Sequence, residues 1–163
     1  MWEIDLEVQK KRGSIQGWHR GFYKDYDWEM KDTCFNRESV EQIYWIKRIT
    51  TNFEFSKFGE LQGLLFNLYF MFDHECEIDK SLNDLANFCF DHDCSGETLL
   101  QNEMGQIFQV TGALNMLAAI YYEELPYDDA HLAWFDRSNE IGLNVGKLMR
   151  YTMAFDPNVV YDW

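Results

Sequence analysis

The segment TLLQNEMGQIFQVTGALNMLAAIYYEEL, from Thr98 to Leu125, predicts the helix that the rest of the chain covers. Thr98 and Gln101 have the spacing of a capping box, and Pro126 ends the pattern because proline disfavours helix in the residue before it. Between these limits the apolar residues form two adjacent stripes: Leu100, Met104, Ile107, Leu114, Ala118 and Tyr121 in one, and Val110, Ala113, Leu117 and Ile120 in the other. Because a helix that is apolar on more than one face needs neighbours on more than one side, we expect a central helix over residues 98–125, roughly 40 Å long.

Apolar spacings of three and four predict further helices before and after this one. They follow Gly13, the caps Asn36 and Ser56, the acidic loop 73–77 and the cap Asp128. No linker or repeat divides the chain. The sequence therefore predicts an all-α fold, a compact single domain over residues 1–163 with about six helices arranged around the central helix 98–125.

Glycines within these predicted helices indicate close packing. Nine of the ten glycines lie in helical patterns rather than in loops, and Gly13, Gly17 and Gly21 recur every four residues. Each glycine costs a helix about 1 kcal/mol relative to alanine, so glycines in register point to the close approach of another helix or an aromatic ring. We expect Gly112 and Gly146 to face neighbouring helices at close range.

The two ends of the chain have the patterns of β-strands. Residues 2–8, WEIDLEV, alternate β-forming and acidic side chains, which predicts a strand within an N-terminal arm of residues 1–12. Residues 158–163, NVVYDW, predict a strand-like tail. A lone strand leaves backbone groups unpaired, so the arm would pair with this tail or with a neighbouring molecule, and we favour the neighbour. The self-association residues would be Trp2, Ile4, Leu6 and Val8.

Charge restricts the classes of partner. The 163 residues include 14 basic and 28 acidic side chains, a net charge of −14. Such a chain is repelled by phosphate backbones and by anionic lipid, so we expect no nucleic-acid partner. The apolar run inside residues 98–125 is shorter than the ~20 residues that cross a bilayer, so we expect no transmembrane segment.

Four cysteines predict two disulfides. If the helices between Cys34 and Cys76 are antiparallel, these two cysteines become neighbours, which leaves Cys89 and Cys94 to close a small loop; other pairings stay open. The even number favours an oxidised protein of the extracellular space or secretory lumen. The N-terminus has no apolar leader, so this localisation requires that a leader has been removed, and a cytoplasmic protein is the alternative.

One loop has part of a calcium-binding pattern. Asp91, Asp93 and Ser95 alternate before Gly96, as in the first half of a calcium loop. The twelfth position is Asn102 instead of the glutamate that supplies two ligand atoms. We therefore prefer a polar turn that caps the next helix, and keep a weak calcium-binding module as an alternative.

No other cofactor or catalytic site is predicted. Cysteine and histidine side chains gather within residues 74–94, but none has the spacing of a zinc knuckle. The chain has no phosphate-binding glycine loop, no GxSxG and no HExxH. We expect no catalytic residues, no metal and no cofactor.

Two segments resemble a known group of proteins. They are GFYKDY, residues 21–26, with a cysteine soon after, and IGLNVGKLMRYTMAFDP, residues 141–157. These segments resemble small secreted, cysteine-stapled helical proteins of ciliated protists, which are loosely similar in style to saposins. The resemblance covers about the last third of the chain and a few earlier residues. It implies a secreted all-α protein and carries over no catalytic residues; the six-cysteine saposin pattern is absent.

These observations favour a non-enzymatic structural or assembly protein. It would self-associate as a homo-oligomer, and through its terminal arm as filaments or rings, because a head-to-tail contact repeats. A small-molecule or lipid carrier is the alternative, since methionine and phenylalanine side chains can line a pocket between helices.

Overall fold

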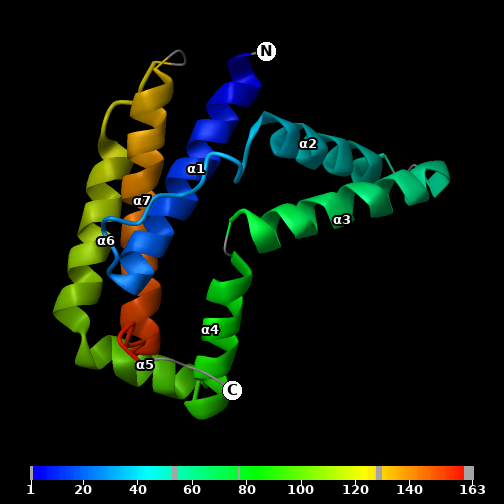
Figure 1. The fold of residues 1–163 in the computed structure, drawn as a ribbon. Coiled ribbons are helices and arrows are strands. Elements are labelled where there is room, and N and C mark those ends of the chain that lie inside the picture. Colours follow the sequence, from blue (N-terminus) through cyan, green and yellow to red (C-terminus); the bar gives the residue numbers. More distant parts are fainter. Residues whose placement is uncertain (1, 53–54, 77, 128–129, 160–163) are drawn as a thin grey trace.

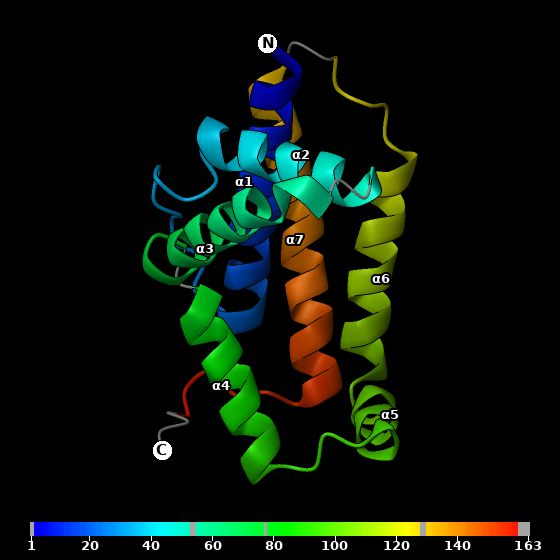
Figure 2. The same cartoon turned by 90° about the vertical axis from the view of Figure 1, so that its right-hand side faces the viewer.

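Two helices lie side by side at the centre of the fold, α1 (Trp2–Tyr23) and α7 (His131–Met153) (Figures 1 and 2). The computed structural model describes residues 2–52, 55–76, 78–127 and 130–159. The first and last helices run parallel, because contacts along α1 advance in the same direction along α7. The remaining helices are arranged around this pair.

Glycines bring the two backbones of α1 and α7 into direct contact. A Cβ added at any of five glycines would collide with a backbone carbonyl of the opposite helix. The glycines are Gly13, Gly17 and Gly21 on α1, which face the carbonyls of Phe135, Asn139 and Leu143, and Gly142 and Gly146 on α7, which face those of Ser14 and Trp18. We call this contact the glycine seam. The prediction for Gly146 is confirmed, whereas that for Gly112 is wrong, since nothing lies within 4 Å of a Cβ there.

Aromatic side chains and one arginine close the lower end of the seam. The Phe22 ring is fully buried and stacks on Phe155 at 4.4 Å between centroids, and Phe88 packs on Phe155 from a third helix. The buried Arg150 guanidinium donates a hydrogen bond to the Gly21 carbonyl in the last turn of α1. A cation is favourable there because the last carbonyls of a helix have no intrahelical partner and carry partial negative charge.

Helix α6 (Ile107–Tyr122) runs antiparallel to α7 and is tied to it at both ends. The side-chain amide of Gln106 donates to the Tyr151 carbonyl at 3.2 Å. At the other end the Arg137 guanidinium donates to the carbonyls of Ile120 and Glu124. One stripe of the helix is buried: Val110, Ala113 and Ile120.

The predicted central helix over residues 98–125 is wrong in two respects. The chain forms α5 (Gly96–Gly105), then breaks at Gln106 and continues as α6. The break follows Gly105, which favours helix weakly, and it lets Asn102 donate to the Thr152 carbonyl at 3.1 Å as α5 turns across the end of α7. Moreover, this segment lies outside the α1–α7 pair rather than at the centre (Figure 1).

Helices α2 (Arg37–Thr51) and α3 (Phe58–His74) form a hairpin that projects from the body on the side away from α6 (Figure 1). A 3₁₀ turn, η1 (Phe55–Lys57), precedes α3, and α4 (Ile78–Asp91) returns the chain toward the lower end of the seam. The predicted cap Asn36 is confirmed, because its side chain accepts a hydrogen bond from the Ser39 amide. The predicted cap Ser56 is wrong, since it lies in the 3₁₀ turn and Lys57 precedes α3 without a side-chain cap. The described residues are thus all-α, with seven α-helices where about six were expected.

The strand predicted for residues 2–8 is wrong, since these residues form the first turns of α1. Leu6 and Val8 point to different sides of this helix, and both are buried. A helix that is covered on two sides can therefore show alternating apolar and polar residues. A strand that is covered on one side shows the same sequence pattern. The Trp2 side chain lies outside the described part, as do residues 160–163 of the predicted tail; residues 158–159 are in a turn.

The seam predicts opposite effects for two glycine substitutions. Gly146→Ala should lower the free energy of unfolding by about 2–3 kcal/mol, because the added methyl must push two backbones apart. Gly112→Ala, the matched control, should raise it by about 0.5–1 kcal/mol, since it adds helix propensity without a clash. Urea denaturation measures both values. Equal shifts for the two variants would show that α1 and α7 do not meet through backbone.

Candidate functional site

The four predicted cysteines lie in two pairs at disulfide distance. Cys34, before α2, meets Cys76, after α3, at a Cα–Cα distance of 5.0 Å, and thereby closes the base of the hairpin. Cys89 meets Cys94 at 5.4 Å, next to the turn that enters α5. This is the pairing that antiparallel helices predicted. Paired cysteines are typical of proteins that fold in an oxidising, extracellular-type compartment.

The loop with the calcium-like pattern forms a helix cap. The Asp93 carboxylate accepts hydrogen bonds from the Thr98 hydroxyl at 2.6 Å and from the Ser95 amide at 2.8 Å. These bonds, the one from Thr98 first, hold the pKa of Asp93 below its ordinary value. Ser95 in turn caps α5. Asp91 makes no contribution to this network of hydrogen bonds. Two of the three residues that suggested an ion site, Asp93 and Ser95, thus start a helix, whereas Asp91 is the last residue of α4.

Titratable side chains are not gathered into a reaction centre in the part of the chain that the structure describes. No group of three histidine, cysteine, aspartate or glutamate side chains there could hold a metal ion. Tyr23 is the most perturbed residue: burial, and then the nearby Asp84, raise the pKa of its phenol. Its hydroxyl donates to Asp84 at 2.8 Å, which joins α1 to α4. This contact is explained by packing between helices.

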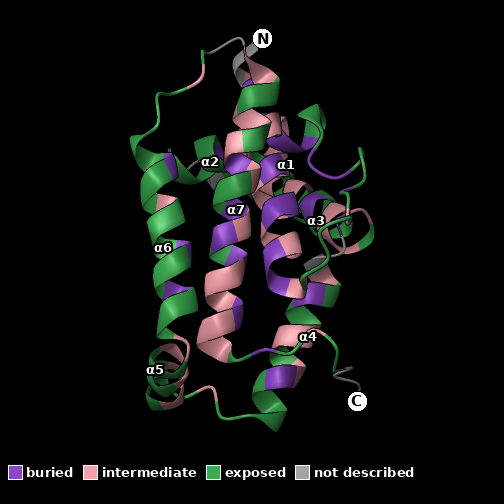
Figure 3. Cartoon of the chain, turned by 90° about the vertical axis from the view of Figure 1, so that its left-hand side faces the viewer, coloured by how far each residue is buried: buried purple, intermediate pink, exposed green. Residues whose placement is uncertain are grey.

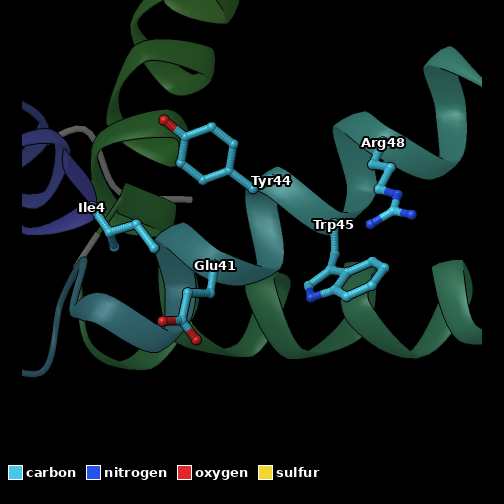
Figure 4. Close-up of a pocket in the computed structure, with 5 residues that line it drawn as sticks. All are labelled: Ile4, Glu41, Tyr44, Trp45 and Arg48. Carbon is cyan, nitrogen blue, oxygen red and sulfur yellow. The ribbon is translucent and has the colours of Figure 1, made fainter. Parts of the chain in front are cut away.

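A shallow pocket opens between α1 and the hairpin. Ile4 lines it from α1, and Glu41, Tyr44, Trp45 and Arg48 line it from α2 (Figure 4). Its volume is about 250 Å³, and it is open to solvent. Ligand pockets of drug size are commonly about 300–1,000 Å³ and enclose most of the ligand. Two further pockets have volumes of about 330 and 420 Å³, and they are also open to solvent. Open pockets of this kind give little support to a carrier role.

Comparisons with protein-family models, curated proteins and solved structures found no match. The helices of the described ranges are also too short or too polar to cross a bilayer. The surface of the molecule is therefore the remaining guide to its function.

That surface is large for the size of the chain. The accessible area is 10,574 Å² for 19.5 kDa, whereas a compact monomer of this mass has about 8,500 Å². The difference is about 2,000 Å². Large apolar side chains contribute to this surface: among the described residues 24 are exposed, whereas 15 apolar residues are buried. Sixteen of the 24 belong to residues 100–125 or to the hairpin.

The outer side of α6 is the first of these two surfaces, and it appears almost wholly exposed in Figure 3. Its residues, which we call the α6 face, are Phe108, Thr111, Gly112, Asn115, Ala118, Ala119 and Tyr122, all exposed. Phe108 is 88% exposed and Tyr122 83%. No charged residue occurs within α6. Its middle is a strip of small side chains between two large aromatic rings.

The outer side of α3 is the second surface. Its members, which we call the hairpin face, are Phe58, Leu65, Phe66, Tyr69 and Phe70, each more than half exposed. Large side chains predominate on this face, in contrast to the small ones in the middle of the α6 face. The buried residue of α3 is Leu68. Exposed apolar patches of this kind mark sites of interaction with other molecules. The sequence analysis singled out neither face, because periodicity does not show which apolar residues the fold leaves exposed.

The two disulfides should differ in how much they stabilise the protein. Replacing both Cys34 and Cys76 by serine opens a loop with a sequence separation of 42, and should cost about 4 kcal/mol in the chain-entropy account. The same change at Cys89 and Cys94, a separation of 5, should cost about 2 kcal/mol. Urea denaturation gives the two values. Intact-mass analysis after alkylation without reductant is the control, and labelling of all four thiols in the native chain would contradict the pairing.

Proposed function

We propose that this protein is a non-enzymatic structural protein that assembles with further copies of itself through the α6 face. The observation that carries this proposal is a helix face without charge, exposed in a chain of net charge −14. Such a face raises the free energy of the protein in water, and covering the face lowers that free energy. No arrangement of side chains among the described residues supports catalysis equally well.

Charge and length favour a protein as the occupant. The net charge of −14 opposes binding to phosphate backbones and to anionic lipid surfaces. The 16 residues of α6 fall short of the ~20 that a bilayer requires. A second copy of the chain carries matching apolar surfaces of its own, and its large accessible area would fall on association. These points support a homo-oligomer.

The contact now proposed differs from the terminal arm that the sequence suggested. Leu6 and Val8 are buried within the protomer, and Ile4 lies against α2. A helix packed in this way offers no strand edge to a neighbour. The proposal therefore transfers self-association from residues 2–8 to α6.

The two cysteine pairs also bear on where the assembly forms. We place it in the extracellular space or in a secretory lumen, where disulfides persist. Two pairs in 163 residues suit that setting.

Sedimentation velocity over a range of concentrations tests the proposal. The wild-type protein should associate at tens of micromolar, and Phe108→Glu should weaken association at least tenfold, because it would place a charge in an apolar contact. Leu82→Glu on α4 is the matched control, since Leu82 is 63% exposed but lies on neither surface. It should associate as the wild type does.

Circular dichroism is the folding control, and both variants should keep the helix content of the wild type. A wild-type protein that remains monomeric at every concentration contradicts the proposal, and so does a Phe108→Glu variant that associates like the wild type.

A further inference from the structure

Acidic charge is concentrated in the part of the chain that contains the α6 face. Residues 81–136 include ten acidic side chains and no lysine or arginine. Three of the acids lie at the two ends of α6: Glu103 near the end of α5, and Glu123 and Glu124 directly after α6. The Arg137 guanidinium lies 4.0 Å from the Glu123 carboxylate. The α6 face is thus an uncharged strip with an acidic border at each end.

Basic charge is concentrated at the tip of the α2–α3 hairpin. Residues 47–57 hold three basic side chains, Lys47, Arg48 and Lys57, and one acidic side chain. The Arg48 guanidinium lies 5.1 Å from the centroid of the Trp45 ring, and the Lys57 ammonium lies 5.6 Å from it (Figure 4 shows Trp45 and Arg48). Glu60 follows in the first turn of α3, so residues 47–60 carry a net charge of +1 beside the aromatic hairpin face.

The two surfaces also match in shape. The α6 face has small side chains in its middle, such as Gly112 and Ala119, and a Cβ at Gly112 would meet nothing within 4 Å. The hairpin face has large ones, among them Phe66 and Tyr69. Large side chains of one helix fill the space above small side chains of another, as ridges fit into grooves.

The two surfaces lie on opposite sides of the α1–α7 pair. In Figure 1 α6 is on one side of that pair, and the hairpin projects from the other. A protomer can therefore use both surfaces at once, each with a different neighbour.

We infer that the hairpin of one copy docks on the α6 face of the next copy, with its basic tip against the acidic border of α6. The inference rests on the proposed function and names the two halves of its contact. Such a contact is heterologous, so it repeats head to tail and builds a filament or a closed ring. A standard interface buries about 800 Å² per partner, so two contacts would cover about 1,600 Å² of each protomer, which is comparable to the excess area of about 2,000 Å².

Charge argues against a two-fold contact between two α6 faces. In an antiparallel pair, Glu123 and Glu124 of one copy would lie near Glu103 of the other. In a parallel pair, each acid would lie beside its own counterpart. Arg137, the basic residue that contacts this border, is already engaged with the end of α6 and with Glu123 of its own copy. Like charges across an interface are unfavourable, whereas the hairpin tip supplies opposite charges.

A complementation experiment tests the inference. One variant blocks the hairpin, Arg48→Glu with Phe66→Glu, and the other blocks the α6 face, Phe108→Glu. Each chain keeps the surface that the other lacks. If the contact is heterologous, each variant alone is monomeric, and an equimolar mixture forms a capped heterodimer of twice 19.5 kDa that grows no further.

Native mass spectrometry of the mixture, with one variant labelled with nitrogen-15, identifies the heterodimer. The Leu82→Glu variant keeps both surfaces and is mixed with each blocked variant as a control. It should associate with both of them, which shows that each blocked variant is still folded. A mixture that stays monomeric, while the wild type assembles, overturns the inference.

The outcomes separate this inference from the proposed function. If the hairpin variant alone still forms dimers and Phe108→Glu does not, the α6 face pairs with itself, so the inference fails and the proposed function stands. If the wild type never associates, or if Phe108→Glu assembles as well as the wild type, both fail. If the wild-type protein stays monomeric but binds a basic helical peptide, the partner is a different protein, and both proposals fail.

Discussion

The backbone contact between α1 and α7 is the constraint on which the rest of the structure depends. Five glycines remove the side chains that would otherwise hold the two helices apart, so the first and last helices of the chain meet along much of their length. The helices are parallel, and all the chain between them must therefore return from the end of α1 to the start of α7. Helices α2 to α6 make that return around the outside of the pair (Figure 2).

A seam made of glycines has a consequence for the distribution of apolar surface. Because backbone meets backbone, the central contact uses few of the 13 phenylalanines, nine tyrosines and six tryptophans of the chain. Small aromatic clusters form at the seam and at the base of the hairpin. Many of the remaining large side chains, including those of α3 and α6, face outward. The glycine seam and the exposed apolar faces are thus two results of the same helix packing. The proposed assembly would bury the apolar side chains that a single protomer leaves exposed.

Local signals in the sequence were sufficient for the helices and for the close packing of some glycines. Asn36 caps α2, Gly146 meets α1, and the cysteine pairs follow from an antiparallel hairpin, since each depends on neighbours or on simple topology. Burial on a particular face could not be predicted, because both stripes of residues 98–125 have the same periodicity and only tertiary contacts cover one of them. For the same reason Leu6 and Val8 resembled a strand. The absence of lysine and arginine from residues 81–136 was a visible signal of the candidate site that periodicity does not reveal.

Native-state hydrogen exchange tests most directly whether the seam is the constraint on which the fold depends. The slowest exchange in a protein marks the unit that opens only with global unfolding. If the seam holds the fold together, the amides of residues 13–23 and 138–150 exchange slowest and at one common free energy, in monomer as in assembly. If the amides of α3 or α6 are the slowest while α1 or α7 exchanges earlier, the fold does not depend on the seam.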